Sequence, residues 1–400
     1  MNDGTAGARR LAIAVIPADG IGIEVVAVGR AVIDVVAERS SAFRVEWTEF
    51  PWGCDYYLRH GRMMAADGLE KLRGFDAIYF GAVGWPTVPD HVSLWGLRLA
   101  ICQGLDLWAN IRPVTFLPGV RGPLRNPGIT GKSWTVVREN SEGEYSGIGG
   151  RNLGARGVGG EIALETALFT EVGCERIIRH AFEVASRQPV RHVTSVTKSN
   201  AQRFGMVLWD EVFERVAADY PDIATDRCLV DAMAARMVLD PESLSVVVAS
   251  NLHADILSDL GSALSGSLGL GCSANLNPER RAPSMFEPVH GSAPAITGLG
   301  IANPIGAVAS AAMMLEHLGY DVEAAWILDA IRSTVAAGIM TPDLGGSCTT
   351  TAFQNHLVSR IQEQTLAVSE HHVTSPARYT PGEDGPAADL PGGSPDPHVA

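Results

Sequence analysis

The chain has 400 residues, of which 46% are apolar and 19% are charged. These values are typical of a globular protein with two or three domains, and they exclude a chain that is disordered over most of its length. Acidic residues outnumber basic residues by 45 to 31, which gives a formal charge of −14 and argues against general binding to a nucleic-acid backbone.

The cysteines indicate a protein of a reducing compartment, and the hydropathy of the chain indicates no membrane-spanning segment. The six cysteines are scattered and form no Cys-x-x-Cys pair, as is typical of cytosolic proteins. The apolar run at 11–16 is too short for a signal peptide, and no apolar stretch has the length of a membrane span. We therefore expect a cytoplasmic protein with no membrane or nucleic-acid partner.

Short apolar runs alternate with longer segments of helical spacing, which predicts an α/β fold with a largely parallel sheet. Strands are expected at residues 11–16, 43–47, 77–83, 134–137, 190–196, 228–230 and 246–249. Helices are expected at residues 23–37, 94–107, 161–186, 204–220, 254–268, 304–318, 322–337 and 351–364. Pro, Gly, Ala and Asp dominate residues 371–400, so we expect 367–400 to be a disordered tail.

Two glycine patterns fail the tests for nucleotide-binding motifs. Gly20 and Gly22 follow the first strand, but the third glycine of a dinucleotide fingerprint falls at Val25. The string Gly-Lys-Ser at 131–133 imitates the end of a P-loop, but the required earlier glycine falls at Asn126. A standard Rossmann site and a P-loop are therefore both rejected.

A pair of aspartates opens the helix expected at 254–268. Asp255 and Asp259 are four residues apart, so both carboxylates lie on one helical face. Two such oxygen donors suit Mg²⁺ or Mn²⁺. The alternative is that acids near a helix N-terminus merely favour the helix dipole.

Basic and polar residues lie where predicted strands end. Arg138 and Tyr145 follow the strand at 134–137, and Arg112 has a similar strand-edge position. Lys198 and Asn200 follow the strand at 190–196, and alternation places them on the same side. Arginines hold carboxylates in bidentate fashion, and α/β sheets bind ligands at such strand ends. The alternatives are a rim salt bridge for each arginine and a solvated surface lysine.

A loop of small residues is a further candidate site. The string Glu-Pro-Val-His-Gly-Ser-Ala-Pro at 287–294 is followed by Asn303 and Pro304, which open a helix. Small residues let a ligand approach the backbone, and a helix N-terminus favours phosphate. A purely structural loop is the alternative.

Taken together, these strings resemble the isocitrate/isopropylmalate dehydrogenase family, which are metal-dependent β-decarboxylating dehydrogenases of (2R)-hydroxyacids. The resemblance covers nearly all the chain except the tail. It rests on Pro-Ala-Asp-Gly-Ile-Gly at 17–22, Val-Arg-Glu-Asn-Ser-Glu-Gly-Glu-Tyr at 137–145, Asn-Leu-His-Ala-Asp-Ile-Leu-Ser-Asp at 251–259, the 287–294 string and Thr-Pro-Asp-Leu-Gly-Gly at 341–346. Gly-Ala-Val-Gly-Trp-Pro at 81–86 and Pro-Asp-His-Val-Ser-Leu-Trp-Gly at 89–96 are most similar to the tartrate/D-malate dehydrogenase branch.

The resemblance implies a two-domain α/β fold with its own cofactor site, distinct from the Rossmann fold. Residues 1–108 and 266–366 would form a larger cofactor-side domain. Residues 109–265 would form an inserted dimerisation and substrate domain. The protein would be a homodimer whose active sites are shared between subunits.

The resemblance also implies catalytic roles by position. Asp255 and Asp259 would hold the metal together with Asp231 of the partner subunit. Lys198, also from the partner, would take the hydroxyl proton during hydride transfer. Tyr145 would protonate the carbon left after decarboxylation. Oxidation alone and oxidation with decarboxylation are both compatible with this set.

Binding residues follow in the same way. Arg112 and Arg138 would hold the substrate carboxylates. The implied cofactor is NAD, with Mn²⁺ or Mg²⁺; NADP and an additional monovalent cation stay open. The residues implied in cofactor binding are Asn200, Glu287, His290, Gly291, Ser292, Ala293 and Asn303.

Two positions depart from the family pattern. The family has an arginine ten residues before Arg112, where this chain has Cys102. The far end of the substrate is then less anionic or differently held, and Arg98, one helical turn earlier, is the nearest replacement. Ala295 stands where NAD-preferring relatives have an aspartate; NAD remains our expectation.

Two other functions stay open. One is a dehydrogenase with isopropylmalate-like or isocitrate-like specificity, which the helix at 94–107 would decide. The other is a non-catalytic regulatory paralogue, suggested by Cys102 and Ala295. The presence of Tyr145, Lys198 and all three aspartates argues against it.

Overall fold

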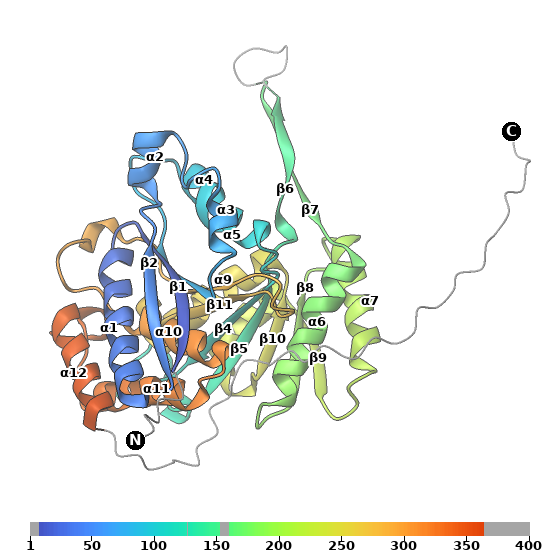
Figure 1. Ribbon diagram of the computed structural model, residues 1–400. Coiled ribbons are helices and arrows are strands. Elements are labelled where there is room, and N and C mark those ends of the chain that lie inside the picture. Colours follow the sequence, from blue (N-terminus) through green and yellow to red (C-terminus); the bar gives the residue numbers. More distant parts are fainter. Residues whose placement is uncertain (1–7, 126, 153–159, 364–400) are drawn as a thin grey trace, which may run out of the picture.

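A ten-stranded sheet forms the centre of the computed structural model, which describes residues 8–125, 127–152 and 160–363 (Figure 1). The strand order is β2 (Phe43–Glu49), β1 (Arg9–Ala18), β3 (Ala77–Ala82), β12 (Ser284–Pro288), β11 (Cys272–Leu276), β4 (Ala109–Thr115), β5 (Ser133–Glu139), β10 (Val246–Ala249), β8 (His192–Thr197) and β9 (Ala224–Leu229). Among the described pairings of this ten-stranded sheet, β12–β11, β11–β4 and β4–β5 are antiparallel and the others are parallel. The predicted α/β fold with a largely parallel sheet is confirmed.

Inner strands of the sheet are buried on both faces, whereas the edge strands β2 and β9 are largely exposed. In β1, Ile13 and Val15 join the core on one face, whereas Ala14 and Ile16 join the core on the other. In β10, Val247 likewise points away from its neighbours Val246 and Val248. This double burial explains why these strands appear in the sequence as continuous apolar runs.

Helices cover each face of the sheet. The first face carries α1 (Gly22–Ser40), α6 (Glu171–Ser186), α7 (Gly205–Ala217), α10 (Ile305–Leu318), α11 (Asp321–Ala336) and α12 (Thr350–Glu363). The second carries α2 (Cys54–His60), α3 (Gly68–Leu72), α4 (Asp90–Ser93), α5 (Leu99–Gly104), α8 (Val230–Leu239) and α9 (Asn251–Ser265). Among the helices of residues 8–125, 127–152 and 160–363, none is long and apolar enough to cross a membrane.

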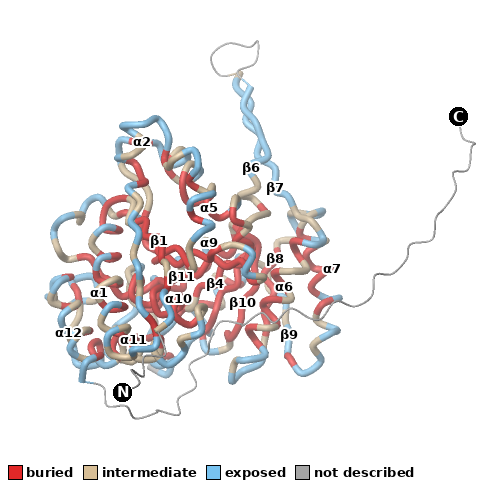
Figure 2. Tube along the Cα trace, in the orientation of Figure 1, coloured by how far each residue is buried: buried red, intermediate tan, exposed pale blue. Residues whose placement is uncertain are grey.

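The helix predicted at 161–186 is wrong in its first part. Residues Ile162–Leu168 form β7, which pairs with β6 (Gly143–Asn152) as an antiparallel hairpin. The hairpin projects from the body of the molecule, and its outer part is exposed (Figures 1 and 2). Helix α6 begins only at Glu171, because Thr170 Oγ1 accepts a hydrogen bond from the Gly173 backbone N–H at 2.9 Å and caps it.

The helix expected at 94–107 is interrupted by a π-helical turn. α4 leads into the turn Leu94–Arg98, and α5 follows it. The Leu99 N–H donates to the Leu94 carbonyl, five residues back. Such a turn changes the direction of the side chains around it and is frequent at functional sites.

The two predicted domains contribute opposite halves of the sheet. Strands β1, β2, β3, β11 and β12 come from 1–108 and 266–366, whereas β4, β5, β8, β9 and β10 come from 109–265. The halves meet where β11 pairs with β4. The division into two domains stays a prediction, and the tail expected at 367–400 lies outside the described residues.

Candidate active site

A cavity of about 290 Å³ lies at the end of β3, between the π turn and α9. Its charged lining residues are Arg98, Arg112, Arg138, Asp255, Asp259 and Glu287. The three positive and three negative charges balance. Tyr145 and His290 also line it, so the structure brings together predicted residues from distant parts of the chain.

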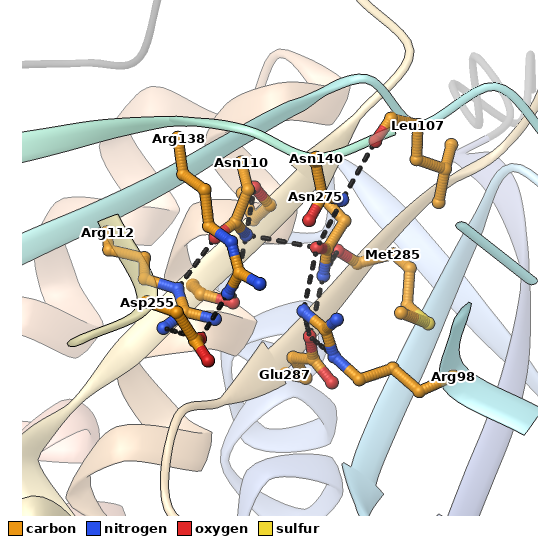
Figure 3. Close-up of polar contacts among 12 residues, drawn as sticks. Arg98, Leu107, Asn110, Arg112, Arg138, Asn140, Asp255, Asn275, Met285 and Glu287 are labelled. Carbon is orange, nitrogen blue, oxygen red and sulfur yellow. Dashed lines mark hydrogen bonds and ion pairs between the residues drawn. The ribbon is translucent and has the colours of Figure 1, made fainter. Parts of the chain in front are cut away.

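Asp255 lies beside Arg112 and Arg138 at one side of the charged cluster (Figure 3). Its carboxylate contacts Arg138 Nη1 and accepts a hydrogen bond from Arg112 Nη1 at 3.2 Å. Burial by itself disfavours the charged form, but Arg138, Arg112 and Arg98 outweigh it and lower the pKa of Asp255 to about 2. Asp259 lies further out, 3.8 Å from Arg112 Nη1, and burial raises its pKa.

Arg112 and Arg138 are both buried and held by neutral side chains. Arg112 donates from Nε to Asn110 Oδ1 at 2.6 Å and from Nη1 to Ser258 Oγ at 2.7 Å. Arg138 donates from Nε and Nη2 to Asn251 Oδ1 at 3.0 and 2.6 Å. Fixed guanidinium groups lose little conformational freedom when they bind an anion. The sequence did not single out these supporting residues, although Asn110 and Arg112 show the two-residue spacing of one strand face.

Tyr145 lies over this cluster from the base of the hairpin. Its hydroxyl donates to Asp255 Oδ2 at 3.1 Å, and the Arg138 guanidinium lies 5.4 Å from its ring centre. Burial, together with the Asp255 charge, raises the pKa of Tyr145. The phenol therefore keeps its proton near neutral pH and is available as a proton donor.

Lys198 and Asp231 lie together, outside the lining of this cavity. Lys198 Nζ forms an ion pair with Asp231 Oδ1. This contact lowers the pKa of Asp231, whose side chain is 65% exposed. Within the described part of the chain, no group of three or more His, Cys, Asp or Glu residues is arranged to hold a metal ion. A single subunit thus presents Asp255 and Asp259 in one place and Asp231 in another.

The predicted strand alternation of Lys198 and Asn200 is wrong. β8 ends at Thr197, and residues 198–200 leave the strand for a turn. The two side chains therefore do not share a strand face. Asn200 is exposed at this turn.

The loop after β12 packs on the loop after β1. Ser292 O accepts a hydrogen bond from the Ile21 N–H at 2.9 Å. Gly20 has φ +59°, and a Cβ on it would lie 2.0 Å from Ser292 O, so only glycine fits this contact. Ala293 has φ +42°, a conformation uncommon outside glycine. The loop is thus held in one conformation.

The loop presents a buried imidazole. His290 Nδ1 lies 3.0 Å from Gly291 O, and His290 Nε2 has no partner among the described residues. Burial lowers the pKa of His290, so the ring is neutral. An unpartnered buried nitrogen of this kind fits a site that a ligand completes. Glu287, three residues earlier and within β12, faces Arg98 instead.

The side chain of Asn303 has a structural role. Its Oδ1 accepts from the Ile305 N–H at 3.0 Å at the start of α10, and its Nδ2 donates to Asp343 Oδ2 at 2.9 Å. The side chain thereby orders the helix N-terminus near the loop 290–293.

Comparisons with known proteins identify the family of this chain. The family model described as isocitrate/isopropylmalate dehydrogenase matches residues 12–357. A probable tartrate dehydrogenase/decarboxylase of Agrobacterium vitis is 57% identical over 342 residues, which cover 86% of this chain and 95% of the relative. The D-malate dehydrogenase [decarboxylating] of Escherichia coli (strain K12) is 48% identical over 349 residues, covering 86% and 96%. A crystal structure of isocitrate dehydrogenase from Methylococcus capsulatus is 34% identical, with a TM-score of 0.80 over 88% of this chain and 100% of that chain. The chain belongs to the isocitrate/isopropylmalate dehydrogenase family.

Proposed function

We propose that this dehydrogenase oxidises a small (2R)-2-hydroxyacid of the tartrate or D-malate type, with a nicotinamide cofactor and with or without loss of the β-carboxyl group as CO₂. The observation that carries the proposal is the cavity in which two fixed arginines, two aspartates and Tyr145 converge. The names of relatives at 48–57% identity favour this substrate class.

Charge balance supports a dicarboxylate substrate. The three arginines and three acids of the lining cancel, so a bound divalent cation leaves two positive charges in excess. A hydroxyacid with two carboxylates restores neutrality in the cavity. Arg112 and Arg138 would hold carboxylate oxygens with donors that are already oriented.

Asp255 and Asp259 are proposed to hold Mg²⁺ or Mn²⁺, since both are hard oxygen donors and both line the cavity. The third carboxylate is proposed to be Asp231 of a second copy, so that the working unit is a homodimer. The exposure of Asp231 leaves it available to a partner. A metal bound there supplies Lewis acidity, which polarises the forming ketone and stabilises the negative charge left when CO₂ departs.

The proton transfers are assigned to Lys198 and Tyr145. Lys198 of the partner subunit would accept the proton of the substrate hydroxyl as the hydride leaves its carbon. Tyr145 holds its proton near neutral pH and would deliver it to the carbon after decarboxylation. Its present acceptor is Asp255, which keeps the phenol oriented toward the proposed reaction centre.

The cofactor is proposed to be NAD, bound along the loop 287–293 with Asn200 and Asn303 nearby. The unpartnered Nε2 of His290 and the tight contact between Ser292 and Gly20 support a preformed site there. NADP and a monovalent cation are separate arms of the assay below. The six free cysteines support a reducing compartment such as the cytoplasm.

A substrate panel tests the proposal. The purified protein is assayed with NAD and with NADP, with Mn²⁺, Mg²⁺ or a chelator, and with or without K⁺. The acids are the tartrates, D-malate, isopropylmalate and isocitrate. We expect metal-dependent reduction of NAD with tartrate or D-malate. Absence of turnover with every acid would contradict the proposal, and a preference for isopropylmalate or isocitrate would correct the substrate class.

A further inference from the structure

Arg98 enters the cavity from the end of the π-helical turn. Its side chain is almost buried, and it lies across the cluster from Asp255 (Figure 3). Arg98 Nε donates to Glu287 Oε1 at 2.8 Å, and Arg98 Nη2 lies 2.7 Å from the same oxygen. Nη2 also donates to Asn275 Oδ1 at 3.2 Å. The guanidinium is therefore fixed from one side by two residues of β12 and β11.

The opposite edge of this guanidinium is unused. Among the described residues, Arg98 Nη1 has no hydrogen-bond partner, although Arg98 lines the cavity. An arginine has five N–H donors in a planar fork, so two of them are left for a ligand. A buried arginine normally has its donors satisfied, which makes this edge a site that a ligand oxygen would complete.

The helical geometry around the π turn decides which side chain reaches the cavity. The π turn ends at Arg98, whereas Cys102, one turn later, is fully buried in the apolar core with Leu97 and Ile101. Cys102 is not among the residues that line the cavity. The cationic group available from this helix is thus Arg98.

Amide side chains connect Arg98 to the other arginines. Asn275 Oδ1 accepts from Arg98 and from Asn110 Nδ2, the latter at 3.0 Å, and Asn110 Oδ1 in turn accepts from Arg112 Nε. Figure 3 shows this relay lying between Asp255 and Glu287. Arg98, Asp255 and Asp259 line the same cavity, so a small acid whose hydroxyl end lies at the two aspartates and whose other end extends along this relay would meet Arg98.

We infer that Arg98, held by Glu287 and Asn275, is the specificity-determining residue that hydrogen-bonds through Nη1 to the carboxylate at the end of the hydroxyacid remote from the oxidised carbon. The inference rests on the proposed function. Because Glu287 already balances the charge of Arg98, the contact selects an acceptor oxygen by the direction of the free N–H groups and not by an excess of positive charge on Arg98.

The test compares two acids of equal length. D-malate has a carboxylate at the far end, whereas (2R)-2-hydroxybutyrate has a methyl group there. Arg98→Lys keeps a cation beside Glu287 but lacks the second arm of the fork, and Arg98→Gln removes the charge. Both acids are measured with each variant, and hydroxybutyrate is also measured as a competitive inhibitor of D-malate. Thermal unfolding reports the fold, because Arg98→Gln leaves Glu287 without its cation.

For both variants we expect the KM for D-malate to rise about 10- to 100-fold. The inhibition constant of hydroxybutyrate and the KM for NAD are expected to change by less than about threefold, because neither contact involves Nη1. Arg176→Gln is the matched control, since it removes a guanidinium from another buried carboxylate, Glu139, outside the cavity lining. Its KM for D-malate is expected to stay unchanged.

Two results overturn the inference: an unchanged KM for D-malate in the folded Arg98→Lys variant, or equal weakening of both acids. Failure of the proposed function looks different, because the unmodified protein would then turn over neither D-malate nor tartrate. In that case, binding is measured in place of the KM, as the increase in melting temperature that D-malate with Mn²⁺ produces. Loss of that increase in Arg98→Lys supports the contact, and its retention contradicts it.

Discussion

The guanidinium of Arg138 contacts the carboxylate of Asp255, so the acid proposed to bind metal is held within the chain by an arginine proposed to bind substrate. Arg112 approaches the same carboxylate at 3.2 Å. Burial opposes ionisation of Asp255, yet these charges lower its pKa to about 2. The carboxylate is therefore ionised near neutral pH and receives a cation without releasing a proton.

Asp255→Asn is expected to reduce Mn²⁺ affinity at least about tenfold and turnover at least about 100-fold, because one charged oxygen donor is lost. Binding is measured by calorimetric titration and turnover by the reduction of NAD. The substitution also removes the nearest carboxylate of two buried arginines, Arg112 and Arg138, so the free energy of unfolding is expected to fall by about 1–3 kcal/mol. Asp222→Asn, at an exposed position, controls for the loss of a surface charge. Unchanged Mn²⁺ binding in a folded Asp255→Asn protein would remove Asp255 from the proposed metal site.

Gly20→Ala is expected to weaken cofactor binding more than substrate binding. A Cβ at Gly20 would lie 2.0 Å from Ser292 O and displace the loop 290–293. We expect the KM for NAD to rise at least about fivefold with little change in the KM for the acid. Gly61→Ala is the matched control, because Gly61 has a similar φ of +68° with no atom within 4 Å of the added Cβ. If both variants behave alike, backbone strain and not the loop contact accounts for the effect.

The buried carboxyl group of Glu316 is expected to make the protein less stable as the pH rises. Burial, with a contribution from Asp321, raises the pKa of Glu316 from 4.5 to about 8. Between these values the unfolded chain loses the proton while the native protein keeps it, so this group lowers stability as pH rises through that window.

Glu316→Gln removes this titration. The variant is expected to be more stable than the unmodified protein at pH 8, by about 1–3 kcal/mol, with the difference shrinking toward pH 5. Thermal unfolding across this range provides the measurement. Glu70→Gln, at an exposed position, is expected to show no such trend. A gain for Glu316→Gln that is the same at both pH values would show that titration is not its cause.

The architecture was predictable from the sequence where burial dictates the pattern. Strands such as β1 are buried on both faces, and this burial produces the continuous apolar runs that predict them. The sequence does not reveal the hairpin β6–β7, because Ile162, Leu164 and Leu168 lie on the fully exposed strand β7 and directly precede the apolar spacing of helix α6. The cap at Thr170 marks the true boundary.

The candidate site was predictable to the level of residue identity but not of geometry. The strings around Arg138 and Asp255 identify residues that meet in the cavity. Nothing in the sequence indicates that a π turn directs Arg98 into the cavity while Cys102 joins the apolar core. The sequence also does not indicate the pairing of Lys198 with Asp231, because Lys198 follows β8 whereas Asp231 lies in the first turn of α8, after β9.

A subunit-mixing experiment tests the central claim, that Lys198 of one subunit acts with Asp255 of the other. Lys198→Ala is expected to abolish oxidation with little effect on folding, because its ion pair with Asp231 is largely exposed. Asp255→Asn is expected to be nearly inactive as well. When the two variants are unfolded together, refolded and allowed to pair, half of the dimers are mixed, and each mixed dimer has one complete active site of two. The account predicts recovery of about one quarter of the normal activity in the mixture, with none when either variant is refolded alone. A mixture shown to contain mixed dimers but as inactive as its components would contradict the shared site.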